Sequence, residues 1–210
     1  MSFADGRFDL LETMAYDPLD GIRLLGLHMA RLAASAKSLG FMFDRHGALN
    51  ELQAATFRLR EKSRLRMLLS RRGNIAVEIR DHRTWPEAIM PVASARRTIG
   101  SDDLRLIHKT TDRQFYRDAL AKAGTYEAVL IDGDGFVTEG CFSSIFVERG
   151  DKLVTPPLSR AILPGILRQN LIAMGEAEEG ELRLRDLDGG FFIGNAARGM
   201  VAATLVAPKG

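Results

Sequence analysis

Residues 104–147 organise the chain, and they read LRLIHKTTDRQFYRDALAKAG to Gly124 and TYEAVLIDGDGFVTEGCFSSIFV from there to Val147. Alternation of apolar and polar residues over 104–108 predicts a strand, and Asp112 follows where a helix N-cap belongs. The helix would end at Gly124. Its predicted apolar face consists of Phe115, Tyr116, Ala119, Leu120 and Ala123. The second part predicts two short strands around the DGDG turn at 132–135.

A lysine and a glutamate each lie at the end of an apolar run in this stretch, namely Lys109 and Glu139. Both residue types are mostly exposed in proteins, so one interpretation is that both are solvated surface residues. The alternative requires a cofactor. A lysine amine can condense with an aldehyde, and a carboxylate can hold a pyridine nitrogen protonated so that the ring accepts electrons.

Five motifs follow one another through this stretch and the rest of the C-terminal half. They are HKTTDRQFY, YEAVLIDGDGFVTEG, SSIFV, TPPLSRAILPGILR and FIGNAARGMV. Their order and spacing over residues 104–204 resemble the class IV aminotransferase family, whose members use pyridoxal 5′-phosphate (PLP). A weaker match covers residues 8–40, through FDLLETMAY and HMARLAASAKSLGF. The KT-x-x-R and GN-x-x-RG details are most similar to the aminodeoxychorismate lyase branch.

The N-terminal part predicts mixed α and β structure. A strand over 8–16, a helix ending before Gly40, a helix over 48–60 and a hairpin over 64–81 follow one another. The resemblance implies an α/β (α+β) fold of type IV with two lobes. The expected domains are a small N-terminal α/β lobe, residues 1–90, and a larger barrel-like lobe that binds PLP, residues 91–210.

The resemblance also implies roles for individual residues. Lys109 would be joined to the PLP aldehyde and act as the base, and Glu139 would pair with the ring nitrogen. The phosphate would be held by Arg31, of the H-x-x-RL motif, and by backbone amides at Gly165, Ile166 and Leu167. Asn195 would contact phosphate or substrate. Thr13 and Arg198 are the substrate candidates.

Each of these residues also has a purely structural interpretation. Arg31 is compatible with a solvated helix face, and the amides at Gly165 with an ordinary loop–helix junction, although helix N-termini favour anions. Asn195 and Arg198 are compatible with a simple turn. Two positions depart from the family, because Ser144 stands where an asparagine is common and Leu167 where aminotransferases often have threonine.

Composition narrows the classes of partner. With 29 Lys+Arg, 27 Asp+Glu and a net charge of +2, the chain is not expected to bind nucleic acid. No apolar run reaches membrane-spanning length, and the four histidines lack metal-ligand spacing. The single cysteine, Cys141, fits a reducing cytoplasm. By resemblance, a small-molecule amino substrate and a homodimer are expected.

Three functions are therefore open. The first is elimination from 4-amino-4-deoxychorismate, giving 4-aminobenzoate and pyruvate. The second is transamination of the branched-chain or D-amino acid type. The third is a degenerate member that keeps the fold without catalysis, although retention of both Lys109 and Glu139 argues against it.

Overall fold

The computed structural model describes residues 8–208 and divides into two compact units. The first unit comprises the chain up to Arg83 together with His108–Asp112. The second comprises Thr84–Ile107 and the chain from Arg113 onward. The chain therefore leaves the first unit, returns to it for five residues, and leaves it again.

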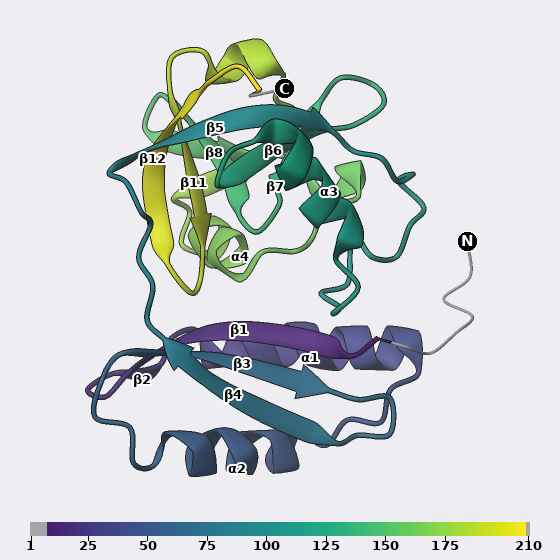
Figure 1. The fold of residues 1–210 in the computed structure, drawn as a ribbon, viewed down its shortest axis with the longest axis vertical. Helices are drawn as coiled ribbons and strands as arrows, with labels where there is room; N and C mark the ends of the chain where they lie inside the picture. The colour runs from purple at the N-terminus through teal and green to yellow at the C-terminus, as the bar shows by residue number, and fades with distance from the viewer. Residues whose placement is uncertain (1–7, 209–210) are drawn as a thin grey trace. The chain divides into compact units, whose positions relative to one another are not determined.

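The first unit is a four-stranded sheet with two helices (Figure 1). The strand order is β2-β1-β3-β4, and all three pairings are antiparallel. The elements are β1 (Leu10–Asp17), β2 (Gly21–Ile22), α1 (Leu25–Leu39), α2 (Arg45–Thr56), β3 (Ser63–Leu69) and β4 (Ile75–Asp81). Apolar residues from β1, β3 and both helices form one buried core. Gly40 ends α1 with φ of 68°, as expected for a left-handed helix cap.

The short segment His108–Asp112 completes this sheet at the edge of β1. The Leu11 N–H donates to the Lys109 carbonyl over 2.9 Å, and the Thr111 N–H donates to the Asp9 carbonyl over 2.9 Å. These bonds flank an antiparallel bridge between Leu10 and Thr110. The backbone at Lys109 is thereby held as if it were an additional strand.

The predicted strand over 104–108 is wrong. Residues 104–107 form turns, in which the Leu106 N–H donates to the Asp103 carbonyl over 3.0 Å. The Asp103 side chain accepts from the backbone N–H of Arg105 and from its guanidinium. An Asp that binds the backbone two residues later favours a turn over a strand, and this local bonding overrides the alternating pattern.

The second unit is an eight-stranded sheet that curls on itself (Figure 1). Its order is β10-β9-β8-β11-β12-β5-β6-β7. The strands are β5 (Ile89–Arg96), β6 (Glu127–Ile131), β7 (Val137–Gly140), β8 (Ser144–Arg149), β9 (Lys152–Thr155), β10 (Ala177–Glu179), β11 (Phe191–Asn195) and β12 (Gly199–Leu205). The helical elements are α3 (Gln114–Ala123), η1 (Leu158–Arg160), α4 (Ile166–Ala173) and η2 (Leu184–Leu187). This mixed architecture confirms the predicted fold class.

Helix α3 packs on β5 and β6 through the predicted apolar face. Phe115, Tyr116, Ala119 and Ala123 are buried, and Gly124 ends the helix with φ of 66°. The predicted N-cap is wrong. The helix begins at Gln114, so the cap position is Arg113, and Asp112 belongs to the segment that pairs with β1.

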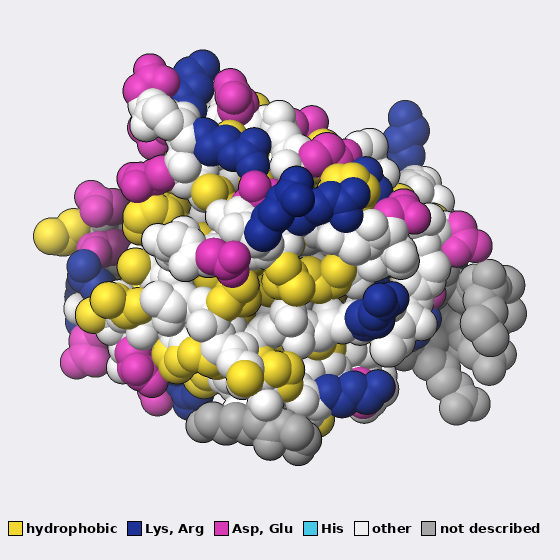
Figure 2. All heavy atoms as spheres, turned by 90° about the horizontal axis from the view of Figure 1, so that it is seen from above, with side chains coloured by type: hydrophobic (Ala, Val, Ile, Leu, Met, Phe, Trp, Pro, Cys, Tyr) yellow, Lys and Arg dark blue, Asp and Glu magenta, His cyan; other side chains and the backbone are white. Residues whose placement is uncertain are grey.

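Charges of both signs are interspersed on the molecular face shown in Figure 2, where apolar side chains gather between them. Across residues 8–208, no helix has the combined length and apolar character needed to cross a bilayer.

At Gly194, β11 packs tightly against Leu167 and against the start of β12, so replacing Gly194 with alanine tests this packing. A Cβ there would lie 2.7 Å from Leu167 Cδ2 and 3.2 Å from both the Gly199 carbonyl oxygen and Met200 Cα. We expect Gly194→Ala to lower the free energy of unfolding in urea by about 1–3 kcal/mol, because the backbone atoms cannot yield. Gly133→Ala is the control, since a Cβ there meets nothing within 4 Å. Equal stability of the two variants would contradict this packing.

Candidate functional site

Glu139 is a buried carboxylate at the end of β7, held by two donors from different elements. The Tyr116 hydroxyl of α3 donates to its Oε1 over 2.7 Å. The Leu163 backbone N–H, from the loop before α4, donates to its Oε2 over 3.2 Å. Burial raises the pKa of Glu139 to about 6, although these hydrogen bonds and the nearby Arg113 charge lower it. A carboxylate in this setting can exchange a proton near neutral pH.

Arg113 supports this arrangement from the start of α3. Its guanidinium lies 4.0 Å from the centroid of the Tyr116 ring and donates to the Cys141 carbonyl over 2.6 Å. Burial, followed by the charge of Glu139, raises the pKa of Tyr116 well above its ordinary value. Tyr116 therefore keeps its proton and remains a donor to Glu139. Cys141 is buried, and burial raises its pKa too, so it stays a neutral thiol.

The loop that donates to Glu139 continues directly into the N-terminus of α4. Gly165 is the cap residue, with extended backbone and no side-chain cap hydrogen bond. A Cβ at Gly165 would collide with the Ser144 hydroxyl, so the glycine leaves this helix end open beside a small polar side chain. Helix N-termini present backbone N–H groups and favour anions. Ser144, which stands where the family commonly has an asparagine, therefore lies directly beside the N-terminus of α4.

Asn195 closes the turn between β11 and β12, which we call the 195–198 turn. Its Oδ1 accepts from the backbone N–H groups of Ala197 and Arg198, each over 3.0 Å. Its Nδ2 donates to the Phe142 carbonyl over 3.0 Å. The side chain therefore shapes the turn and ties it to the segment that follows Glu139. Contact of Asn195 with phosphate or substrate stays a prediction.

Arg198 is oriented by three aromatic rings of the same unit. Its guanidinium carbon lies 5.2 Å from the ring centroids of Trp85 and Phe142 and 5.3 Å from that of Tyr126. Its Nη1 donates to the Tyr126 hydroxyl over 2.6 Å. Cation–π contacts of this kind hold a guanidinium in place while it keeps its charge.

In the first unit, Arg31 belongs to a buried ion cluster around Glu12. Arg31 donates to both oxygens of the Glu12 carboxylate, over 2.8 and 2.6 Å. His28 Nδ1 lies 2.7 Å from the same carboxylate. Burial alone would raise the pKa of Glu12, but the Arg31 charge and the bonds from His28 and Arg31 lower it to about 2. His28 and Arg31 both contact Glu12, which explains their spacing in the H-x-x-R motif. Contact of Arg31 with phosphate stays a prediction.

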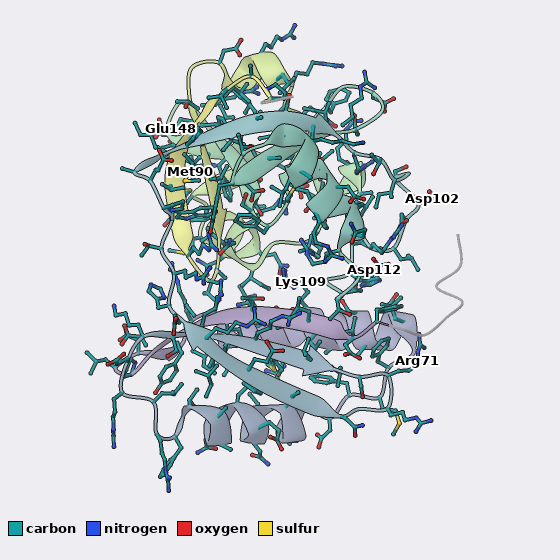
Figure 3. All side chains as sticks on the ribbon, viewed as in Figure 1. Arg71, Met90, Asp102, Lys109, Asp112 and Glu148 are labelled. Carbon is teal, nitrogen blue, oxygen red and sulfur yellow. The ribbon has the colours of Figure 1, made fainter. Side chains whose placement is uncertain are left out.

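Lys109, labelled in Figure 3, is half-buried in the segment that pairs with β1. Residues opposite each other in a ladder project to the same face, so Lys109 shares a face with Leu11 and, by alternation, with Thr13. Glu12 projects to the opposite face, where α1 packs. The preceding residue, His108, is buried with its Nδ1 3.0 Å from the Ser35 hydroxyl, and burial lowers its pKa.

The structure thus connects Glu139, Leu163 and the α4 N-terminus, and separately connects Asn195 and Arg198 to Phe142. Sequence reasoning missed Tyr116, Arg113 and Glu12 as partners. It also missed Glu127, a fully buried carboxylate at the start of β6. A charged residue inside the apolar run YEAVLI was the available signal. Within residues 8–208, no group of His, Cys, Asp or Glu side chains is suited to hold a metal ion.

Comparison with known proteins places these residues in a recognised family. The model for amino-transferase class IV matches residues 9–206. A candidate aminodeoxychorismate lyase of Schizosaccharomyces pombe is 27% identical over 86% of this chain and 80% of its own. A candidate branched-chain aminotransferase of Methanocaldococcus jannaschii is 41% identical, over 36% of this chain and 29% of its own. The crystal structure of a candidate amino-acid aminotransferase from Mesorhizobium loti, 32% identical, has a TM-score of 0.88 and covers 95% of this chain and 100% of its own.

The Glu12 cluster predicts a specific pH dependence of stability. Folding lowers the pKa of Glu12 from 4.5 to about 2. The contribution of this carboxylate to the free energy of unfolding is therefore complete above pH 4.5 and is lost as pH falls toward 2. That contribution is about 3 kcal/mol, at about 1.4 kcal/mol per pKa unit. Glu12→Gln removes the counter-charge of Arg31 and should destabilise the protein at pH 6 by about 3–5 kcal/mol.

Urea unfolding of both proteins from pH 6 to pH 3 measures the effect. The stability gap between wild type and Glu12→Gln should narrow as pH falls below 4.5, because the unfolded-state carboxyl takes up a proton there while the folded carboxylate, with a pKa of about 2, stays ionised. A gap independent of pH would show that the carboxylate charge does not stabilise the fold.

Proposed function

Given that this chain belongs to the class IV aminotransferase family, whose members are PLP enzymes, we propose that it acts as a lyase of the 4-amino-4-deoxychorismate type. The reaction would be elimination, giving 4-aminobenzoate and pyruvate. The observation that best supports this proposal is the buried Glu139 carboxylate with its two hydrogen-bond donors. The same chain supplies Lys109 in a segment that is hydrogen-bonded to β1.

The residues of the second unit fit the chemistry of PLP. The cofactor combines a pyridine nitrogen with a phosphate, and when bound it accepts electrons from the substrate carbon. Glu139 supplies a carboxylate for the nitrogen. The α4 N-terminus supplies backbone N–H groups for the phosphate, through Gly165, Ile166 and Leu167. Because Leu163 binds Glu139, these two contacts are mechanically connected.

Glu139 would act by holding its charge against the ring nitrogen. Tyr116 stays protonated and donates to Oε1, which fixes the orientation of the carboxylate. A pKa of about 6 leaves Glu139 mostly ionised at neutral pH, so its carboxylate would accept a hydrogen bond from the protonated ring nitrogen and keep the proton there.

Lys109 would hold the cofactor aldehyde and then move the substrate proton at its Nζ. Two backbone hydrogen bonds fix the chain at the Lys109 carbonyl and at the Thr111 N–H, so the Lys109 side chain starts from an ordered position. Thr13 shares its face of the sheet and would contact the substrate. Arg31, positioned by Glu12, would contribute positive charge to the phosphate.

Arg198 would bind a substrate carboxylate. The surrounding rings keep the guanidinium oriented, and charge-assisted bonds from arginine to carboxylates are strong and directional. Asn195 would set the turn that carries it.

Transamination is the second candidate, and a specific observation favours it. The Mesorhizobium loti structure, described as a candidate amino-acid aminotransferase, matches across its full length. The Schizosaccharomyces pombe relative and the KT-x-x-R motif favour the lyase. Release of pyruvate from 4-amino-4-deoxychorismate, compared with amino-group exchange between amino acids and 2-oxo acids, separates the two. We also propose a homodimer, which light scattering coupled to gel filtration would test.

Lys109→Ala tests the cofactor lysine. Wild type should gain a visible absorption band with PLP, and borohydride should fix the cofactor mass on the peptide containing Lys109. The variant should show neither change, and its activity should fall by about 10²–10⁴-fold because the base is lost. Lys122→Ala, an exposed lysine on α3, is the matched control and should behave as wild type. Capture of PLP by Lys109→Ala at another lysine would refute the assignment.

Arg198→Met tests the carboxylate contact. KM for the substrate should rise by about 10–100-fold, because a charge-assisted hydrogen bond is lost, while PLP affinity stays unchanged. Arg183→Met is the control, since Arg183 also stacks on an aromatic ring, Phe136, at 3.9 Å. If KM is unchanged in Arg198→Met, Arg198 does not bind the substrate.

A further inference from the structure

Glu127 lies at the start of β6 with no exposed surface and accepts four hydrogen bonds. Its Oε1 accepts from the backbone N–H groups of Ala128, over 2.9 Å, and Cys141, over 2.7 Å. Its Oε2 accepts from the Phe142 N–H, over 3.1 Å, and from the Ser143 hydroxyl, over 2.8 Å. Three of the four donors come from the tight turn after Glu139, which we call the 140–143 turn.

The 140–143 turn is built around this carboxylate. The Gly140 N–H donates to the Ser143 carbonyl over 2.8 Å, which closes the turn. A Cβ at Gly140 would lie 3.0 Å from Glu127 Oε2 and would collide with the Ser143 hydroxyl. The glycine is therefore needed because the carboxylate occupies the concave side of the turn.

The 140–143 turn contacts both groups of site residues in the second unit. Its Cys141 carbonyl accepts from Arg113, whose guanidinium lies over the ring of Tyr116, the partner of Glu139. Its Phe142 carbonyl accepts from Asn195, which in turn fixes the backbone N–H groups of Ala197 and Arg198. A continuous series of hydrogen bonds thus runs from Glu127 to Arg198.

We propose that Glu127 is a positioning residue: by holding the 140–143 turn, it sets the 195–198 turn and the orientation of Arg198 toward substrate. Its consequence for catalysis rests on the function proposed above, whereas its ordering of the two turns does not. Burial of a charge in this position is compatible with the fold because four donors surround it.

Amide hydrogen exchange of the protein without added cofactor tests the ordering directly. In Glu127→Gln, the glutamine NH2 group faces N–H donors and cannot accept from them. Peptides covering Cys141–Phe142 and Ala197–Arg198 should exchange about tenfold faster than in wild type. Emission of Trp85, the single tryptophan, should also change, because its ring stacks on Phe142 at 5.8 Å.

Thr138→Val is the matched control for loss of a buried polar contact in the same hairpin. The Thr138 hydroxyl donates to the Leu130 carbonyl over 3.0 Å. The valine variant should lose stability while exchange at Ala197–Arg198 stays as in wild type. Acceleration there in both variants would mean that Glu127 acts through general stability, and the proposal would be overturned.

Kinetics then test the link to Arg198. Glu127→Gln should raise the substrate KM, and combining it with Arg198→Met should add little further, since both changes remove the same contact. Fully additive effects would overturn the proposal while leaving the proposed function intact. If wild type fails to capture PLP, the proposed function fails, and the exchange comparison still decides whether Glu127 orders the two turns.

Discussion

Burial of negative charge is the constraint on which this structure depends. Glu12, Glu127 and Glu139 are all withdrawn from water, and each is matched by a different kind of donor. Glu12 has arginine and histidine, Glu127 has backbone amides and a hydroxyl, and Glu139 has a tyrosine hydroxyl and one amide. Their pKa values diverge accordingly, to about 2, 7 and 6. Full positive charge keeps a buried carboxylate ionised, whereas neutral donors leave it close to titration.

This division corresponds to different tasks. A strongly ionised Glu12 is suited to holding Arg31 in a single orientation, and it needs no proton exchange to do so. Glu139, held by two neutral donors and with a pKa of about 6, can exchange a proton near neutral pH. The aromatic rings around Arg198 orient a positive charge without neutralising it. In the proposed function, rigid presentation of each charge would help to bring the reacting groups into productive geometry.

The sequence predicted most elements because they depend on local patterns. The apolar face of α3, the glycine caps at Gly40 and Gly124, and the hairpin carrying Glu139 all follow from spacing within a few residues. The wrong predictions arose where local hydrogen bonds competed with the residue pattern, or where the contacts join residues far apart in the sequence. Asp103 turned an alternating segment away from strand structure, and Asp112 did not cap α3 because residues 108–112 pair with β1. The partners of Glu139 could not be predicted, since Tyr116 and Leu163 lie 23 and 24 residues away.

The return of His108–Asp112 to the first unit affects how that unit forms during synthesis. Its sheet cannot be completed when the ribosome has made residue 83, because the edge of β1 still lacks the segment that contains Lys109. Until then, the Leu11 N–H and Asp9 carbonyl present an open edge of the kind that recruits other chains. A fragment cut after Arg83 would keep this defect permanently. The segment that contains Lys109 therefore also covers an edge of β1 that would otherwise be open to pairing with other chains.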